Sequence, residues 1–279
     1  MIDLHTHSTC SDGTDGPERL AELAAAAGCA AFALTDHDTL VGLGAARHRA
    51  DELGVRLVPG CEVSCAYQGR NPHVLVYFVE AGEGPLQEEL GRLREDRKSR
   101  NGQLVERLYE LGLPISYEEL VEESGDEDSV GRPHVASVMV RRGMVESIPD
   151  AFDRWLGEGK PAYVPKARVT PAEIAELAKG SGGVAVLAHP LSLELGRKEL
   201  GMAAGELAEA GLVGLEAFYA RYNRDDRAML REIAQRNGLV ATGGTDYHGT
   251  LKAGLSVCVG EGDLAVPDYV LDELEARRP

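Results

Sequence analysis

Three residues near the start of the chain, His5, His7 and Asp12, are of types that bind metal ions. They lie in IDLHTHSTCSDGT, residues 2–14, where apolar and polar residues alternate as on a buried strand that opens into a loop. His5 and His7 then point the same way, because side chains repeat every two residues on an extended chain. Two neighbouring imidazoles either bind a metal ion or repel each other when protonated, so the rest of the chain must decide between a metal site and chance.

More histidines and carboxylates accompany the other strands that the sequence predicts. These strands are short and apolar and alternate with helix-like segments, which favours parallel strands covered on both faces. They cover residues 2–5, 31–35, 55–59, 73–79, 184–188, 212–217 and 239–243. The polar residues that flank or follow strands two to seven are Asp36, His37, Asp38, Glu62, His73, His189, Glu216, Asp246 and His248.

Seven strand–helix units in order predict an α/β barrel, with a doubly wound open sheet as the alternative. In such a barrel the carboxyl ends of all strands open onto one face, where active sites form. Polar residues that follow different strands would therefore meet there, although they come from both ends of the chain.

A cluster of imidazoles and carboxylates at a barrel mouth would be costly to desolvate without cations. Mixed nitrogen and oxygen ligands without thiolate indicate manganese, iron or zinc rather than calcium or a structural zinc site. The set is too large for one ion and suits two or three, and Glu62 could bridge ions because a carboxylate has two oxygens. The nine candidate ligands are His5, His7, Asp12, His37, Glu62, His73, His189, Asp246 and His248.

Residues 81–165 interrupt the alternation, because they are charged, helical in pattern and without a good strand. Pro133 is suited to begin one of the helices there. We interpret this stretch as a helical insertion that covers the barrel mouth. The barrel itself would then consist of residues 1–80 and 166–279.

Basic residues of the insertion form a candidate anion site. His134, in GRPHVAS, is expected in the first turn of a helix beside Arg132, where an anion binds readily. The alternative is a capping or packing role. Arg94, Arg97 and Arg100 recur every three residues on one helix face, which is either solvated or turned toward the barrel mouth.

Composition limits the possible partners. The formal net charge of −17 disfavours a long nucleic acid or an anionic membrane, but a metal cluster would still attract a small anion. Five cysteines without a signal peptide predict a cytoplasmic protein whose cysteines are small buried residues rather than zinc ligands. The longest apolar stretch, residues 24–34, is too short to span a membrane. We expect a monomer or a small homo-oligomer.

Five motifs in order, HTHSTCSDG, LTDHDT, GCEVS, AHP and GGTDYHG, resemble the PHP family, named for polymerase and histidinol phosphatase domains. Within it, the chain resembles stand-alone metal-dependent phosphoesterases, including the 3′,5′-nucleoside bisphosphate phosphatase branch. GRPHVAS and GKPAYVP (residues 159–165) match the insertion of that branch. The resemblance covers nearly the whole chain.

The resemblance implies a distorted (β/α)7 barrel and a trinuclear metal centre. It assigns three ligand sets: His5, His7, Glu62 and Asp246; Glu62, His73 and His189; and Asp12, His37 and His248. It places Arg97, Arg100, Arg132 and His134 where relatives hold substrate phosphate. One departure is Tyr222 in EAFYARYN, near a place where some relatives carry histidine, which puts the leaving-group pocket in question.

The expected activity is hydrolysis of a small phosphate monoester, foremost the 3′-phosphate of a 3′,5′-nucleoside bisphosphate, with manganese the favoured metal. Asp246 or His37 would move the proton. A cyclic-phosphate or oligonucleotide phosphodiesterase is the alternative. An amidohydrolase is disfavoured because no barrel lysine is obviously placed as a carbamylated bridge. A non-catalytic metal-binding module is disfavoured because the ligand set is intact.

Overall fold

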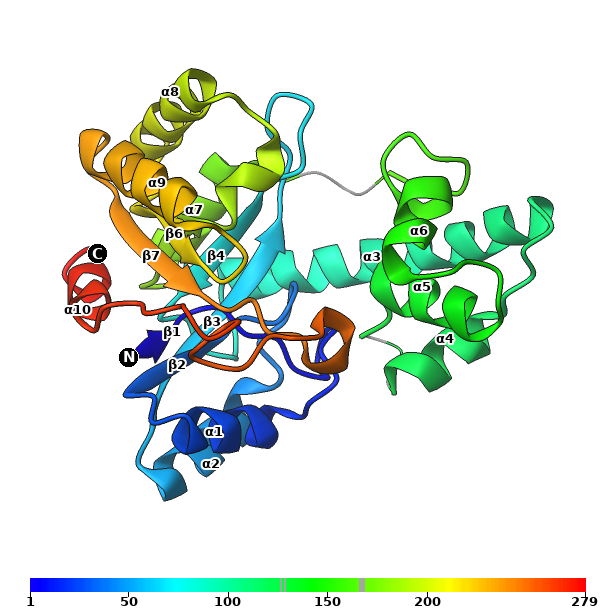
Figure 1. Cartoon of the computed structure of the whole chain (residues 1–279), viewed down its shortest axis with the longest axis horizontal. Helices are drawn as coiled ribbons and strands as arrows, with labels where there is room; N and C mark the ends of the chain where they lie inside the picture. The colour runs from blue at the N-terminus through cyan, green and yellow to red at the C-terminus, as the bar shows by residue number, and fades with distance from the viewer. Residues whose placement is uncertain (126, 128, 166–168) are drawn as a thin grey trace.

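The computed structural model describes residues 1–125, 127, 129–165 and 169–279. Its sheet contains seven strands in chain order (Figure 1). They are β1 (Ile2–Asp3), β2 (Ala31–Leu34), β3 (Arg56–Ser64), β4 (His73–Tyr77), β5 (Val184–Leu187), β6 (Gly214–Tyr219) and β7 (Val240–Gly244). The two ends of the sheet meet, because Leu4 N donates to Gly243 O at 3.1 Å and Asp246 N donates to His5 O at 2.8 Å. The sheet thus forms a nearly closed, distorted (β/α)7 barrel, as expected.

One strand corrects the expectation of parallel strands. β4 runs antiparallel to both β3 and β5, whereas the other neighbours pair in parallel. Residues 65–72 between β3 and β4 are too few for a crossover helix, so the chain turns back on itself. His73, the first residue of β4, pairs with Ser64, the last of β3. It therefore lies at the barrel end where the parallel strands finish.

Helices cover the outside of the barrel (Figure 1). They are α1 (Pro17–Ala26), α2 (Leu43–Leu53), α7 (Pro171–Gly180), α8 (Arg197–Glu209), α9 (Arg224–Arg236) and α10 (Tyr269–Glu275), with short helices η2 (Pro190–Leu193) and η3 (Gly249–Lys252). α7 begins with a capping box, in which the Thr170 hydroxyl accepts from Glu173 N and the Glu173 carboxylate accepts from Thr170 N. Such reciprocal bonds satisfy backbone groups that a helix terminus leaves unpaired.

The strands bury both of their faces. Phe32 and Leu34 of β2 pack in an apolar cluster with helix residues such as Leu20. Ala31 and Ala33, on the opposite face of the same strand, pack in a second cluster with residues of β4 and α10. Alternation along one strand thus fills the barrel interior and also holds the helices outside.

A helical lobe projects from the barrel between β4 and α7 (Figure 1). It comprises α3 (Pro85–Glu110), α4 (Tyr117–Ser124), α5 (Arg132–Arg141), α6 (Ile148–Ala151) and the π-helical turn η1 (Phe152–Leu156). It has an apolar cluster of its own, with Leu108, Leu120 and Met139 at its centre. The exact division at residues 80/81 and 165/166 stays a prediction, and residues 166–168 lie outside the described part of the chain.

Four of the five cysteines are buried as expected, and two of these four are joined to each other. Cys29 and Cys258, 229 residues apart in sequence, form a disulfide. Cys61 and Cys65 are buried as expected and lie outside this disulfide, whereas Cys10 is only half-buried. The pairing joins the start of β2 to the segment after β7, a contact between chain ends that local spacing does not reveal. Among the described helices, each is too short or too polar to cross a membrane.

Candidate metal centre

The carboxylate of Glu62 lies at the centre of the barrel mouth and is almost fully buried. Its Oε2 lies 3.1–3.3 Å from ring nitrogens of three histidines, and its Oε1 lies 2.9 Å from ring nitrogens of two more. The five imidazoles belong to His5, His7, His37, His73 and His189. Glu62 lies within β3, two residues before its end, because β3 extends further than the sequence predicts.

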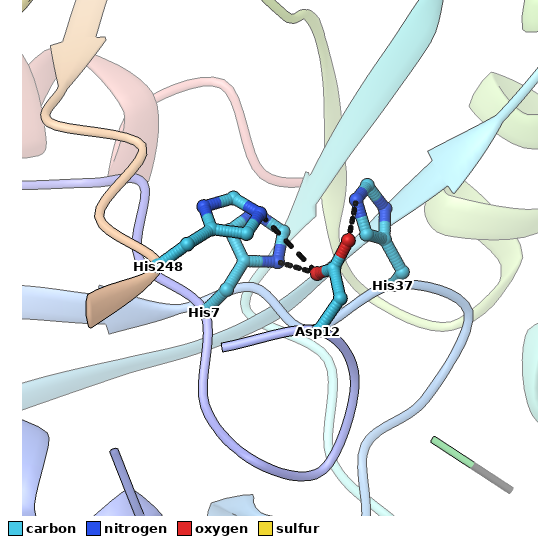
Figure 2. Close-up of side chains that lie close together, drawn as sticks. All are labelled: His7, Asp12, His37 and His248. Carbon is cyan, nitrogen blue, oxygen red and sulfur yellow. Dashed lines mark ion pairs between the residues drawn. The ribbon is translucent and has the colours of Figure 1, made fainter. Parts of the chain in front are cut away.

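A second carboxylate, Asp12, organises the neighbouring part of the mouth (Figure 2). Its Oδ1 lies 3.2 Å from His248 Nε2 and 3.8 Å from His7 Nδ1, and its Oδ2 lies 3.7 Å from His37 Nε2. These side chains come from loops that follow β1, β2 and β7. The topology therefore brings both ends of the sequence to one point.

Potential ligand atoms fall into three groups, each with its atoms within 4.8 Å of one another. The groups are His5, His7, Glu62 and Asp246; His7, Asp12, His37 and His248; and His37, Glu62 and His73. They overlap, because His7, His37 and Glu62 each belong to two groups. The first equals one of the sets expected from sequence, and the second adds His7 to another. In the third, His37 stands where His189 was expected, although His189 Nε2 contacts Glu62 Oε1. The division of ligands among ions stays a prediction.

The donor atoms lie close enough together to share metal ions. His5 Nε2 and His7 Nε2 face each other at 3.1 Å, which needs a proton or a cation between them. His37 Nδ1 is buried and lies 3.3 Å from Glu62 Oε2, but it forms no hydrogen bond with any described residue. Nitrogen and oxygen ligands in this mixture suit manganese, iron or zinc. The residues present therefore fit a centre of more than one metal ion.

The histidine pKa values diverge at this centre. Burial lowers the pKa of His7 to about 4, and His248 acts in the same direction. Burial would also lower the pKa of His5, but the carboxylates of Glu216, Asp246 and Glu62 hold it well above its ordinary value. Neighbouring imidazoles therefore differ in charge in the metal-free protein. Such a difference is expected where two ligands share one proton in the place that a metal ion would otherwise take.

The carboxylates of the centre are held in their ionised form. Burial alone would raise their pKa values, but the imidazoles of His5, His37 and His73 hold the pKa of Glu62 well below its usual range. Asp246 behaves alike, because Lys252 and His5 outweigh the effect of burial on its pKa. Ionised carboxylates are the form that binds metal.

An outer layer of contacts orients the candidate ligands. Glu216, which is fully buried, places Oε1 3.0 Å from His5 Nδ1 and accepts a hydrogen bond from His189 N at 2.7 Å. A carboxylate on the far nitrogen of a ligating histidine fixes its tautomer and raises its basicity. The sequence places Glu216 at the end of a strand but indicates no role for it. Its predicted position at the barrel mouth was the feature that could have marked it as part of the site.

Asp246 has two outer partners that sequence reasoning missed. The Tyr219 hydroxyl donates to Asp246 Oδ2 at 2.8 Å, and Lys252 Nζ contacts the same oxygen. Tyr219 ends β6 and Lys252 ends η3, so both positions follow strands and could have been considered. Tyr222 lies near the place where some relatives carry histidine. Its hydroxyl accepts a hydrogen bond from Leu191 N of η2 at 3.0 Å.

A cavity of about 400 Å³ lies between the barrel mouth and the insertion, and Asp12, His37 and His73 line it. Arg97, Arg100 and Arg132 of the insertion also line it. Candidate ligands and insertion arginines therefore face one space.

Arg100 is a buried cation in the lining of this cavity. It is 8% exposed, and its Nε finds no hydrogen-bond partner among the described residues. Burial and the nearby Arg97 and Arg132 lower the pKa of Arg100 to about 10, so the group is still charged at neutral pH. Arg97, by contrast, pairs with Asp38. A buried guanidinium without a carboxylate is costly unless a ligand supplies the negative charge.

His134 lies beside these arginines in sequence but performs another task in the structure. Its Nδ1 accepts a hydrogen bond from Gly131 N at 3.1 Å, which is the capping role considered as the alternative. Burial lowers the pKa of His134. Its contact with substrate phosphate stays a prediction.

Comparison with known proteins agrees with this geometry. The model of the PHP domain family matches residues 3–123. The 3′,5′-nucleoside bisphosphate phosphatase of Chromobacterium violaceum is 31% identical over 99% of this chain and 97% of its own length. The 5′-3′ exoribonuclease Rnm of Salmonella typhimurium is 30% identical over 89% of this chain and 85% of its own.

Two further relatives extend the comparison. The phosphoribosyl 1,2-cyclic phosphate 1,2-diphosphodiesterase of Eggerthella lenta is 35% identical over 88% of this chain and 94% of its own length. A crystal structure from Bifidobacterium adolescentis, described as a metal-dependent phosphoesterase, superposes with a TM-score of 0.87 at 29% identity, covering 100% of this chain and 96% of that one.

The barrel and its clusters of imidazoles and carboxylates define a metal-dependent hydrolase. The chain belongs to the PHP family, and it is a metal-dependent phosphoesterase.

Proposed function

We propose that this phosphoesterase hydrolyses the 3′-phosphate of a 3′,5′-nucleoside bisphosphate. The observation that carries the proposal is that one cavity holds both the ligand clusters and Arg100, whose Nε finds no hydrogen-bond partner among the described residues. A substrate with two phosphates would place one over the clusters and the other on the insertion arginines. The Chromobacterium violaceum relative carries the corresponding name.

The ligands would hold two or three divalent ions, manganese foremost, in the sets given above. Such ions lower the pKa of bound water and neutralise charge that develops on phosphate oxygens. Arg100 and Arg132 would bind the second phosphate, and their fixed position converts that binding into orientation of the scissile bond. Asp246 or His37 would move the proton.

The surroundings of these two candidates differ. Asp246 Oδ2 already accepts a hydrogen bond from Tyr219 and contacts Lys252, which keep it ionised. His37 lines the cavity, and burial holds its pKa well below the ordinary value, so its ring is neutral and able to accept a proton. This contrast favours His37 as the group that exchanges a proton with the substrate.

A phosphodiesterase is the second candidate function. It is favoured by relatives named 5′-3′ exoribonuclease and cyclic-phosphate diphosphodiesterase at similar identity. The same ligand clusters would serve either reaction, so the residues that bind the rest of the substrate decide between them.

The test begins with phosphate release by the manganese-loaded protein from 3′-phosphoadenosine 5′-phosphate, 3′-AMP, histidinol phosphate, cyclic phosphates and short oligonucleotides. We expect the bisphosphate to be preferred and metal analysis to give two or three ions per chain. Activity on cyclic esters alone would replace the proposal with the second candidate.

Arg100→Met sharpens the test by removing the buried positive charge from the cavity lining. A hydrogen bond to a charged group is worth about 1.5–3 kcal/mol, so kcat/KM for the bisphosphate should fall by about 10- to 150-fold. The decrease for 3′-AMP, which lacks the second phosphate, should be far smaller. Arg107→Met is the matched control, because Arg107 lies on the same helix and donates to Tyr163 O outside the cavity lining. Equal decreases on both substrates would contradict the role of Arg100.

A further inference from the structure

The Cys29–Cys258 disulfide ties a barrel strand to an irregular part of the chain. Cys29 lies two residues before β2, and Cys258 lies between η3 and α10. The structure describes every residue of the range 253–268 there, and within it finds isolated bridges but no helix or strand. We call residues 253–268 the closing segment. Neither cysteine belongs to the candidate ligands or to the cavity lining, so the disulfide has no part in the proposed function.

The backbone of the closing segment is fastened to the carboxylate of Asp3, in β1. Cys258 N donates to Asp3 Oδ2 at 2.8 Å. The same carboxylate accepts from Thr245 N at 2.9 Å, from the Thr245 hydroxyl at 2.7 Å and from His5 N at 3.3 Å. Asp3 is fully buried, and a buried carboxylate is costly unless such hydrogen bonds are made. The Cys258 N–H is therefore part of what holds Asp3 in place.

Asp3 is in turn joined to two candidate metal ligands. It bonds the backbone of His5 directly, and it bonds Thr245, whose neighbour in sequence is Asp246. His5 and Asp246 belong to the same group of potential ligand atoms. A displacement of Asp3 would therefore disturb that group at two of its members.

Cys258 has a backbone conformation that needs support. Its φ is 72°, in the left-handed region that residues with a side chain rarely adopt. Such conformations persist only where the surrounding structure holds them. The disulfide and the hydrogen bond to Asp3 provide that support. Once the disulfide is reduced, Cys258 can leave this conformation and withdraw its N–H from Asp3.

The closing segment can open without the barrel unfolding. Besides the disulfide, it meets the barrel through a bridge between Ile2 and Val266 and through the ion pair of Arg227 with Asp263. Asp263 is 66% exposed, so this ion pair contributes little. Irregular segments open locally at a lower cost in free energy than the central strands of a barrel. A small reductant can therefore reach the buried sulfur atoms.

We infer that Cys29 and Cys258 form a reversible redox site whose state controls how tightly the centre holds its metal ions. The partner is a dithiol reductant. This inference goes beyond the proposed function, because it is the same whichever phosphate ester is hydrolysed. The cysteine usage predicts a reducing compartment, and disulfides that form in such a compartment are usually transient or redox-sensing.

The exchange balances in electrons and protons. A thiolate of the dithiol attacks the sulfur of Cys29, which is the more exposed of the two cysteines, and Cys258 leaves as a thiolate that takes up a proton. The second thiolate of the reductant then attacks the mixed disulfide and releases Cys29, which also takes up a proton. The reductant ends as a disulfide, so two electrons have passed to the cysteine pair. An oxidant that is itself a disulfide reverses the exchange.

The experiment compares the whole chain in its oxidised and reduced states. Dithiothreitol reduces one sample and is removed by gel filtration under nitrogen. Thiol titration of the unfolded chain should count three thiols before reduction and five after it, because two of the five cysteines form the disulfide. The midpoint of heat unfolding of the chelator-treated protein should fall by about 10 °C on reduction, since the disulfide closes a long loop.

Manganese titration measures the coupling to the centre. The dissociation constant of the tightest manganese ion should rise about tenfold on reduction, as expected for the loss of one hydrogen bond to a charged group. Reoxidation with oxidised glutathione should restore both the unfolding midpoint and the manganese affinity.

Cys29→Ala should reproduce the reduced state. Its manganese affinity should be about tenfold weaker than that of the oxidised wild-type protein and should not change with dithiothreitol. Cys10→Ala is the matched control, because it removes a cysteine outside the disulfide and should keep the wild-type response. Circular dichroism before each titration should show the same fold for both variants.

Three outcomes would overturn the redox site. Five thiols in the protein purified in air would show that the pair does not close. Equal manganese affinity in the two states would show that the pair does not act on the centre. A response of Cys29→Ala as large as that of the wild-type protein would assign the effect to another cysteine. Each of these results leaves the proposed function intact, and failure to hydrolyse the bisphosphate would leave the redox site intact.

Discussion

Glu216→Gln tests whether the outer carboxylate determines how His5 binds metal. In the structure, Glu216 accepts from His189 N with one oxygen and faces His5 Nδ1 with the other. A glutamine has the same shape, but one of its two positions carries an amide NH2 instead of an acceptor. If the amide faces His189 N, two donors oppose each other. If it faces His5 Nδ1, that nitrogen must become an acceptor, and the ring proton moves to Nε2, the atom that faces His7.

The magnitude follows from the hydrogen bond that the substitution removes. Either orientation of the amide breaks one hydrogen bond to a charged group, worth about 1.5–3 kcal/mol. Removal of a carboxylate that orients a ligating histidine weakens metal binding by about 10- to 100-fold. We therefore expect the dissociation constant of the tightest manganese ion to rise within that range, while the shape of the buried pocket is preserved.

The assay is metal titration of chelator-treated protein by calorimetry, with ions per chain counted by elemental analysis. Glu206→Gln is the control, because it makes the same chemical change on an exposed carboxylate that contacts Tyr67 and Gln68. Circular dichroism should show the same fold for all three proteins. A manganese affinity for Glu216→Gln equal to that of the control would refute the reasoning.

Two further predictions concern protonation and local stability. In the metal-free protein the pKa of His5 is held well above its ordinary value by Glu216, Asp246 and Glu62, so the ring carries a proton at pH 7 that a bound metal must displace. Metal loading should therefore release protons, and the affinity for metal should fall as pH is lowered from 8 to 6. Calorimetry in buffers of different ionisation enthalpy measures both effects. A metal affinity that does not change with pH would contradict the protonated state assigned to His5. Thr170→Ala should lower the free energy of unfolding by about 1 kcal/mol in urea, because it removes one bond of the α7 capping box; an unchanged denaturation midpoint would show that the cap contributes nothing.

Local patterns were enough to predict most of the barrel. All seven strands overlap the short apolar runs that indicated them, although β3 continues past residue 59 to Ser64. These features depend on residues close in sequence, so they can be read along the chain. The convergence of polar residues at the barrel mouth followed from the same reasoning, since strand order decides which loops meet.

Features that depend on distant contacts were not predictable in this way. β4 runs antiparallel to β3 because a turn, and not a helix, connects the two strands. The apolar pattern of β4 itself does not encode this direction. The Cys29–Cys258 pair and the contact between Lys252 and Asp246 arise only when the barrel closes. The partners of Glu216 lie 211 and 27 residues away, so its place in the chain indicated a location but no task.

The distribution of the centre along the sequence has a consequence for biosynthesis. His5 follows the first of the seven barrel strands to be synthesised, whereas Asp246 and His248 follow the last of them. A nascent chain therefore carries several histidines and carboxylates that could capture a metal ion singly long before their partners exist. The complete groups form only when β7 closes against β1, so selection of the correct ions is a late event that follows barrel closure. A chain shortened before β7 would retain most of the motifs and still lack an intact centre.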